Sequence, residues 1–596
     1  MLSELLEYVE QERVFTDEEL EESKSLPLGQ LVNKGLAIDG LTLVKQVEDQ
    51  VLFKCETNNS KVKIGDKVTF ENQHDKCSAT VVENLLNEIT LRFDPPFRTL
   101  ATDATYTIRV NKYQFLSPII ESLKTLVPGS PGMYYCNVLC GKEAPIDSLY
   151  GGIPDSQTSR MLQSFHVDLN QSQKAAIIKS LKRPSLLAIQ GPPGTGKTLV
   201  LTLVAELFSS LGMRVAILAP THQATNTCLN EIGKHDSHSQ VYKIGEILKS
   251  EGLSPDIKTL AYKEFQKAYR KRKLADNSII GTTFYSAIIH LGLRASSFAP
   301  NVILIDEAGQ IPLAYGILSG LFGAGSIIYF GDDAQMPPVF HPKLAHHPLS
   351  KSIFQQIRDT HPTCIHPLVV SYRLNSTLCE LLGNLFYLDN SGNCFLKSVD
   401  KNAGRKLKLD FPEGTPSIFR KVLNGSDSLV WINSVTSELC TDSNKEEASA
   451  IARLVYICVQ SGLTTKDLAI VTPFRKQSAA IRTALHQIDP NMSEFPVIDT
   501  VERVQGTSVE VVIISYASND ITYIRNIAEF LYSPNRLNVA LSRSKSKAIL
   551  FVSEIMIQNI CRTTKIHREP LLYISKKANA HYDLKDLLVS DKAKED

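Results

Sequence analysis

The chain has 596 residues, of which 43% are hydrophobic and 21% are charged. This length exceeds what a single hydrophobic core supports, so the sequence predicts several domains. The formal net charge of +1 argues against a protein that coats nucleic acid by bulk electrostatics, but it allows a motor with a local basic channel.

The start of the chain and its cysteines indicate the compartment. The first residues are acidic and helix-like, and they lack the basic and apolar regions of a secretory signal. No apolar run approaches the ~20 residues that cross a bilayer. We therefore expect a soluble protein of the cytoplasm, the nucleus or both. Eleven cysteines are scattered without a CxxC pair, which favours free thiols over a zinc module.

The N-terminal part of the chain changes character twice. We expect a helical segment at residues 1–35, followed at 36–113 by short β-branched runs that Gly, Asn, Asp and Pro interrupt. Such runs predict an accessory antiparallel β-barrel. Residues 114–160 predict a helical stalk and a linker, because PGSPG at Pro128–Gly132 breaks the helical pattern.

The remainder alternates apolar strands with helices. Runs such as LLAIQ and NVILIDEA end at polar or glycine-containing turns, as buried parallel strands do. The predicted fold class is therefore α/β, with one parallel-sheet domain at 161–345 and a second at 346–570. We expect a small helical insertion at about 232–280 in the first domain, and a polar tail at 571–596.

GPPGTGKT lies between an apolar strand and a helical run, which is the context of a phosphate-binding P-loop. Its glycines let backbone N–H groups surround phosphates, while Lys197 neutralises phosphate oxygens and Thr198 is placed to bind Mg²⁺. Asp306, in NVILIDEAGQ, is suited to hold Mg²⁺, and Glu307 to orient or deprotonate water. ATP and Mg²⁺ are the predicted cofactors. The predicted residues of the loop are Gly191, Pro192, Pro193, Gly194, Thr195, Gly196, Lys197 and Thr198.

The predicted catalytic residues are Lys197, Glu307 and three further polar residues. Gln335, in GDDAQMPP, follows a strand and is placed to sense the γ-phosphate. Arg373, in SYRLN, and Arg543, in ALSR, lie in the second domain, where guanidinium groups neutralise charge on a transferred phosphoryl group. ATP is therefore expected to bind in a cleft between the two domains.

Ten motifs occur in the order and spacing of superfamily 1 helicases: LNQSQ, GPPGTGKT, APTHQAT, GTTFYSA, DEAGQ, GDDAQMPP, SYR, VTPFRKQ, TVERVQG and RLNVALSR. The chain resembles the up-frameshift and immunoglobulin-mu-binding branch of these enzymes, which is superfamily 1B of the DNA2/NAM7 type. The resemblance implies two tandem RecA-like domains and an ATP-dependent helicase or translocase. It also implies 5′-to-3′ movement on single-stranded RNA or DNA. Because both arginines lie in one chain, we expect the ATP site to work in a monomer, without a partner subunit.

The resemblance also assigns roles to individual residues. Gln173, with Asn170 nearby, is implied to read the adenine edge, and Tyr372 to stack on the base. The family places an acid two residues after QG to meet the ribose, and this chain has Ser508 there. The nucleic-acid contacts that the resemblance and the strand-end positions imply are Pro220, Thr221, His222, Thr282, Thr283, Pro473, Phe474, Thr500 and Gln505.

Two other functions fit parts of the sequence. GPPGTGKT is equally common in AAA+ protein remodellers, although the 109 residues from Lys197 to Asp306 are long for that class. A catalytically weak helicase that serves as a nucleic-acid-binding scaffold is the other alternative, and the departure at Ser508 is its only support.

Two polar clusters have no assigned role. Lys263, Lys267, Arg270 and Lys271 share one face of a predicted helix, which either touches the nucleic-acid strand or is simply solvated. His341, His346 and His347, in HPKLAHHP, favour loop histidines over a metal cluster.

Overall fold

The structure is a computed structural model, and its described residues lie between 2 and 589. The ranges outside the description are 56–57, 59, 61, 63–65, 73–75, 85–86, 94–99, 103, 111–115, 149–152, 164–166, 233, 235–239, 251, 272–273, 293–298, 437, 491, 493 and 561–568. Within the described part, no helix is long and apolar enough to span a membrane.

A closed antiparallel β-barrel follows two N-terminal helices, as the sequence predicts. Its strand order is β1-β2-β5-β4-β3-β6. Alternate residues point inward, and the aromatic rings of Phe53, Phe70 and Tyr106 pack together in the interior. The elements are α1 (Leu2–Ser25), α2 (Leu28–Asn33), β1 (Ala37–Val47), β2 (Gln50–Lys54), β3 (Lys67–Glu71), β4 (Lys76–Asn84), β5 (Glu88–Phe93) and β6 (Thr105–Val110).

An eight-stranded parallel sheet forms the first α/β unit, in the order β10-β9-β11-β8-β12-β13-β7-β14. Its strands read as continuous apolar runs because helices cover both faces. In β7, Leu186 and Ala188 enter one hydrophobic cluster, whereas Leu187 and Ile189 enter another. The strands are β7 (Leu186–Gln190), β8 (Val215–Ala219), β9 (Val241–Ile244), β10 (Lys258–Leu260), β11 (Ile279–Thr283), β12 (Val302–Ile305), β13 (Ser326–Gly331) and β14 (Ile365–Pro367).

Helices precede and surround this sheet. The helices of this part of the chain are α3 (Leu116–Lys124), α4 (Pro131–Leu139), α5 (Asp155–Gln163), α6 (Gln171–Leu181), α7 (Lys197–Ser210), α8 (His222–Glu231), α9 (Tyr262–Arg270), α10 (Phe284–Ser286), α11 (Leu313–Gly316) and α12 (Ile353–Thr360).

Two sequence predictions about this sheet need correction. The insertion expected to be helical at about 232–280 contains β9 and β10 as well as α9, and these strands extend the sheet in parallel from β11. Strand β14 lies beyond the predicted boundary at 345 but pairs with β7 of the first sheet. Both errors have one cause, because strands of three or four residues are too short to show a periodic pattern.

A six-stranded parallel sheet forms the second α/β unit, in the order β19-β18-β20-β21-β17-β22. A two-stranded parallel pair, β15 (Val370–Ser371) and β16 (Lys397–Ser398), precedes it. The strands of the sheet are β17 (Leu429–Asn433), β18 (Leu468–Val471), β19 (Val497–Asp499), β20 (Val509–Ser515), β21 (Ser544–Val552) and β22 (Ala580–Asp583).

The helices of the second unit include the end of the described chain. They are α13 (Ser376–Phe386), α14 (Asp400–Ala403), α15 (Ser417–Val422), α16 (Lys445–Gln460), α17 (Arg475–Ile488), α18 (Ile521–Asn526), α19 (Ala528–Leu531), α20 (Pro534–Leu541), α21 (Glu554–Ile560), α22 (Glu569–Lys577) and α23 (Leu584–Val589). The polar tail predicted at 571–596 is therefore wrong for its described part. Strand β22 pairs with β17, and the buried Leu584 and Leu587 anchor α23 on the core.

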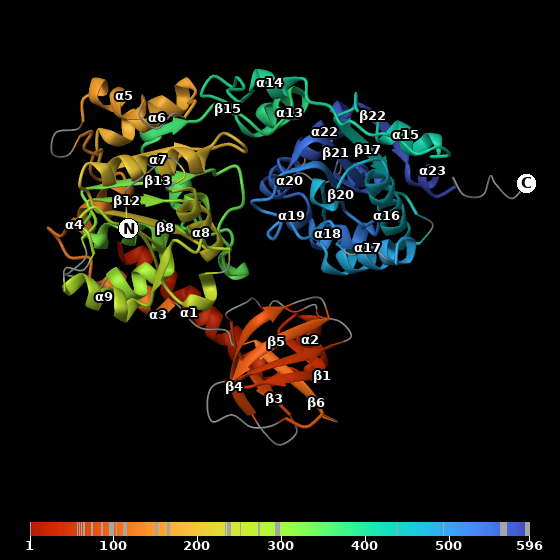
Figure 1. Ribbon diagram of the computed structural model, residues 1–596, viewed down its shortest axis with the longest axis horizontal. Helices are drawn as coiled ribbons and strands as arrows, with labels where there is room; N and C mark the ends of the chain where they lie inside the picture. Colours follow the sequence, from red (N-terminus) through yellow and green to blue (C-terminus); the bar gives the residue numbers. More distant parts are fainter. Residues whose placement is uncertain are drawn as a thin grey trace, which may run out of the picture.

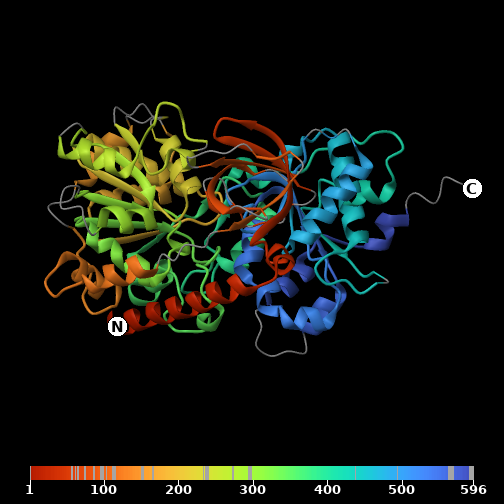
Figure 2. The same ribbon diagram turned by 90° about the horizontal axis from the view of Figure 1, so that it is seen from below.

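The two α/β units lie side by side, and the barrel lies below the junction between them (Figure 1). The barrel contacts both units: Lys249 Nζ lies 3.8 Å from Asp66 Oδ1, and Arg475 Nη1 donates to the Ser60 carbonyl at 3.1 Å. Helix α1 runs beneath the first unit towards the barrel (Figure 2). The barrel is thus connected to both units.

Candidate functional site

The P-loop between β7 and α7 adopts a backbone that only glycine accommodates without strain. Gly194 and Gly196 have φ values of +73° and +79°, in the left-handed region. A Cβ on Gly191 would lie 2.7 Å from Lys197 Cβ. The loop therefore has the close-fitting curved backbone of a phosphate cradle, and it ends at the N-terminus of α7, where unpaired N–H groups favour an anion.

Lys197 joins the loop to the two acids after β12. Its Nζ lies 2.6 Å from Asp306 Oδ1 and 2.6 Å from Glu307 Oε1. Burial would lower the pKa of Lys197, but the two carboxylates outweigh it and raise that pKa overall. Glu307 has φ +52°, an unfavourable conformation for a non-glycine residue, and its other oxygen accepts from Gln310 Nε2 at 3.1 Å. The side chain of Glu307 is thus fixed beside the loop.

Asp306 is buried, and both of its oxygens have partners. Oδ1 faces Lys197, and Oδ2 accepts from the thiol of Cys228 on α8 at 3.3 Å. Burial raises the pKa of Cys228 well above its usual value, so this side chain is a thiol that donates. Sequence analysis missed Cys228 because it lies 78 positions from its partner, in no motif of its own.

The GDDAQMPP loop contributes a buried acid that sequence analysis missed. Asp332 Oδ2 accepts from Gln335 Nε2 at 2.6 Å and from the Tyr387 hydroxyl at 2.8 Å. Burial, with Asp333 adding a like charge, raises the pKa of Asp332 to about 7. Gln335, the predicted γ-phosphate sensor, is therefore held against Asp332 in this structure.

The same loop forms the main polar connection to the second unit. Asn538 Nδ2, on α20, donates to the Tyr387 hydroxyl and to the Ala334 carbonyl, both at 2.8 Å. Asn535 Nδ2, one turn earlier, donates to the Asp333 carbonyl at 3.0 Å. Because Asp332 and Ala334 follow the first sheet while Tyr387 and Asn538 belong to the second unit, these bonds join the two units.

Both predicted arginines come from the second unit and lie close to each other. Arg373 Nη1 donates to the Ser542 carbonyl at 2.9 Å, and Arg543 Nη2 donates to the Ser542 hydroxyl at 3.1 Å. Burial lowers the pKa of Arg373 to about 10, and burial together with Arg373 lowers that of Arg543 to about 9. Among the described residues, neither guanidinium has a carboxylate partner. A buried and a half-buried cationic group without counter-ions are suited to an anionic ligand.

Arg373 also lies against the P-loop. The backbone N–H of Tyr372 donates to the Gly194 carbonyl at 2.8 Å, and the Ser371 hydroxyl donates to the Pro193 carbonyl at 2.9 Å. A Cβ on Gly194 would lie 2.5 Å from Arg373 Cβ. The structure thus places Arg373 beside the loop, as the cleft hypothesis requires.

The residues predicted to read the base cluster at the start of α6. Asn170 caps this helix by accepting from the Gln173 backbone N–H at 3.0 Å, and Gln173 Oε1 accepts from the Asn170 N–H at 3.1 Å. Gln173 Nε2 donates to the Thr195 carbonyl, and Asn170 Nδ2 donates to the Tyr372 hydroxyl, both at 3.0 Å. Asn170, Gln173 and Tyr372 thus adjoin the P-loop, and base recognition by these three residues stays a prediction.

The ribose side of the site has no acid at the expected position. Ser508 is half-buried just before β20. Glu510, two residues later, accepts from the Ser546 hydroxyl at 2.5 Å and lies 3.6 Å from Lys545 Nζ. Its carboxylate is therefore held by the second unit.

The residues predicted to contact nucleic acid differ in exposure. Thr282, Thr283 and Phe474 are buried, and the Phe474 ring packs against Tyr523 and Phe530. These three are thus not available to a strand in this structure. Thr221 is exposed, and the other five are partly exposed: Pro220, His222, Pro473, Thr500 and Gln505.

Two of these residues also have local structural roles. Thr221 caps α8 by accepting from the Ala224 N–H at 3.1 Å, and Thr283 caps α10. Burial, together with the charges of Lys243 and Lys249, lowers the pKa of His222 to about 4. His222 is therefore neutral at physiological pH.

The two unassigned clusters differ in their surroundings. Lys263, Lys267, Arg270 and Lys271 are all exposed at α9. The histidines contact other elements instead: His341 Nε2 lies 3.0 Å from Glu19 Oε1 on α1, His346 Nε2 lies 3.8 Å from Glu529 Oε1, and the His347 ring lies 4.9 Å from that of Tyr8. No group of three potential metal ligands occurs among the described residues.

Two family models match the α/β part of the chain. Both are described as an AAA domain, and they cover residues 168–351 and 349–554. Together with the two parallel sheets and the P-loop, they define a protein with tandem RecA-like P-loop units. These matches support the resemblance to superfamily 1B helicases of the DNA2/NAM7 type that the motifs predict.

Individual relatives are distant. The DNA replication ATP-dependent helicase/nuclease DNA2 of Xenopus laevis is 27% identical over 64% of this chain and 37% of its own length. The Regulator of nonsense transcripts 1 homolog of Drosophila melanogaster is 29% identical, over 64% and 34% respectively. The JHS1 helicase/nuclease of Arabidopsis thaliana is 26% identical, over 66% and 29%. The chain thus spans about a third of the length of the curated relatives it matches.

Among solved structures, the arterivirus nonstructural protein 10 (helicase) is similar with a TM-score of 0.40 and 10% identity, covering 93% of this chain and 83% of the viral one.

Proposed function

We propose that the chain is an ATP-dependent helicase or translocase that moves along single-stranded nucleic acid. The observation that carries this proposal is the composition of the phosphate site. Lys197, Asp306 and Glu307 come from the first unit, and Arg373 and Arg543 come from the second. A ligand that binds all five changes how the units sit against each other, and such a change is what a translocase needs.

The chain's own groups supply the steps of hydrolysis. In this structure Lys197 is paired with two carboxylates, and phosphate oxygens are the ligand that would replace them. Glu307, once released, is positioned to take a proton from water. Arg373 and Arg543 then stabilise the charge on the transferred phosphoryl group.

The donors near the P-loop fit Mg²⁺. Thr198 provides a hydroxyl and Asp306 a buried carboxylate, which are hard oxygen ligands. Mg²⁺, when bound, neutralises phosphate charge. Thr198 and Asp306 would hold it. Because the Cys228 thiol donates to Oδ2 of Asp306, Oδ1 is the oxygen that would face the ion.

The hydrogen bonds between the two units couple hydrolysis of ATP to their relative movement. Gln335 and Asp332 lie at one end of a chain of bonds that passes through Tyr387 to Asn538. A change at Gln335 when the γ-phosphate is lost would alter this chain and thereby the position of α20. Strand movement then follows from alternate closing and opening of the units.

The substrate and the direction are tested together. ATPase activity is measured with matched single-stranded RNA and DNA, and unwinding with duplexes that carry a 5′ or a 3′ tail. We expect stimulation by at least one nucleic acid and unwinding from the 5′ tail. The Glu307→Gln variant should bind ATP but not unwind. ATPase activity that neither nucleic acid changes would contradict the proposal and favour a protein remodeller.

A further inference from the structure

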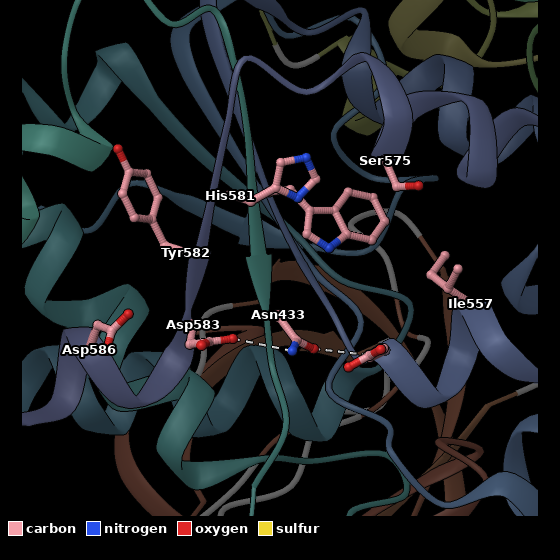
Figure 3. Close-up of a pocket in the computed structure, with 9 residues that line it drawn as sticks. Asn433, Ile557, Ser575, His581, Tyr582, Asp583 and Asp586 are labelled. Carbon is pink, nitrogen blue, oxygen red and sulfur yellow. Dashed lines mark hydrogen bonds between the residues drawn. The ribbon is translucent and has the colours of Figure 1, made fainter.

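A cavity of about 440 Å³ lies at the β22 edge of the second sheet, apart from the ATP site. Its described lining comes from the ends of β17 and β22 and from α21, α22 and α23. Asn433, at the carboxyl end of β17, joins β22 to the start of α21, because its Nδ2 donates to Asp583 Oδ1 at 3.2 Å while its Oδ1 accepts from the Glu554 N–H at 3.0 Å (Figure 3).

The cavity is acidic. Glu554, Asp583 and Asp586 contribute three carboxylates, and none of the described lining residues is a lysine or arginine. Among the described residues, Lys585 pairs with this lining: its Nζ lies 3.6 Å from Asp583 Oδ2, and its side chain is 75% exposed. An exposed lysine of this kind is held weakly and is easily displaced. A phosphodiester backbone would be repelled here, so the occupant is cationic.

Trp431 forms an aromatic wall and has an unused donor. The residue is only 5% exposed, and it lines the cavity. Within the described chain the indole N–H has no hydrogen-bond acceptor. Because the indole nitrogen is not among the sealed polar atoms that lack a partner, it opens into the cavity, where the carbonyl group of a ligand can accept from it. The His581 ring lies 6.5 Å from that of Trp431 and extends the aromatic surface.

The neighbouring strand favours a peptide. Strand β22 is the last in the sheet order, and among the described strands it pairs only with β17. Its outer edge therefore carries backbone N–H and C=O groups that an extended segment can use. A peptide also supplies the carbonyl acceptor that the Trp431 N–H lacks.

We infer that this acidic cavity binds an arginine side chain from a peptide of a partner protein. The planar guanidinium packs against the exposed His581 ring and the accessible edge of Trp431, and it donates to Asp583 and Asp586. Backbone groups beside that arginine pair with the Trp431 N–H and with the β22 edge. The site is independent of the ATPase, because its described lining includes no residue of the P-loop and neither catalytic arginine.

The chain itself provides the optical probe, since Trp431 is its only tryptophan. The full-length protein is titrated with an acetylated, amidated peptide of three arginines while tryptophan fluorescence is recorded. We expect a saturable change whose midpoint rises with salt. The triglutamate peptide should give no change. Spermidine should bind at least about tenfold more weakly, because it has neither a planar guanidinium group nor a carbonyl group.

Matched variants test the location. Asp583→Asn with Asp586→Asn should weaken arginine-peptide binding at least about tenfold, the scale of a lost charge-assisted bond. In Asp583→Asn the new amide oxygen can still accept from Asn433, so the fold is kept. Glu413→Gln, an exposed charge elsewhere in the same unit, should leave binding unchanged.

Three results would overturn the inference: no saturation with the arginine peptide, equal binding of spermidine, or equal weakening by Glu413→Gln. Basal ATPase activity should be the same in all of these proteins. A failed peptide titration with intact ATPase activity would therefore leave the helicase proposal standing.

Discussion

Removing the Tyr387 hydroxyl should loosen the connection between the two α/β units without disturbing either core. In a Tyr387→Phe variant, two bonds of 2.8 Å disappear, one to the Asp332 carboxylate and one from Asn538 Nδ2. A bond to a charged group contributes about 1.5–3 kcal/mol and a neutral one about 1 kcal/mol. Because the pKa of Asp332 is about 7, the acid is only partly charged at neutral pH. We therefore expect a total loss of about 2 kcal/mol.

This loss should be visible as faster amide exchange in the GDDAQMPP loop. The Ala334 N–H donates to Asp332 Oδ1 at 3.2 Å, so it reports on the position of that acid. A loss of about 2 kcal/mol corresponds to roughly 30-fold faster exchange, measured by hydrogen–deuterium mass spectrometry of the full-length protein.

Tyr532→Phe is the matched control. It removes another buried hydroxyl, which donates to the Met556 carbonyl at 3.1 Å inside the second unit. We expect no change in the exchange of the loop in this variant. Equal exchange in the wild type and in Tyr387→Phe, or equal acceleration by both variants, would refute the assignment of Tyr387 to the interunit connection.

Three further predictions concern the site itself. Glu307→Gln should keep ATP binding but slow single-turnover hydrolysis at least ~100-fold, because the proton acceptor is lost; near-normal turnover would reject the role of Glu307. Arg543→Gln should slow hydrolysis by about 1,000-fold with a smaller change in ATP affinity, as measured with a fluorescent nucleotide, whereas loss of binding alone would indicate a structural role. Asp332 favours its protonated form when folded, with a pKa of about 7 against a usual 3.8, so its contribution to stability is full below about pH 4 and is lost as pH rises through 7. The melting temperature should therefore fall between pH 6 and pH 8 in the wild type more than in Asp332→Asn, and parallel curves would contradict this.

Sequence reasoning worked best where the chemistry is local. The P-loop, the acids after β12 and the two arginines lie in short motifs whose residue types the phosphate chemistry requires, and the structure brings them together. The barrel was predictable for a similar reason, because alternating burial imposes a pattern with a period of two.

The missed residues are defined by distant partners. Tyr387 meets Asp332 across 55 positions and Asn538 across 151, and a tyrosine after a helix carries no local sign of either contact. Phe474, by contrast, was predicted to contact nucleic acid but is buried. Its place at a strand end suggested an exposed ring, but Tyr523 of α18 and Phe530 of α19 cover that ring.

Short strands were the other source of error. Strand β22 has four residues and lies in a polar segment, so only its pairing with β17 identifies it. Its register places His581 opposite Trp431. One side of the acidic cavity is thus built by a part of the chain that composition alone marked as a tail.

The link between the two units has a mechanical consequence. After β14 the chain leaves the first sheet, and within a few residues Ser371 and Tyr372 are bonded to the P-loop carbonyls of Pro193 and Gly194. The start of the second unit is therefore fastened directly to the P-loop backbone. Any shift of that loop would be passed to the second unit through these two hydrogen bonds, without an intervening flexible linker.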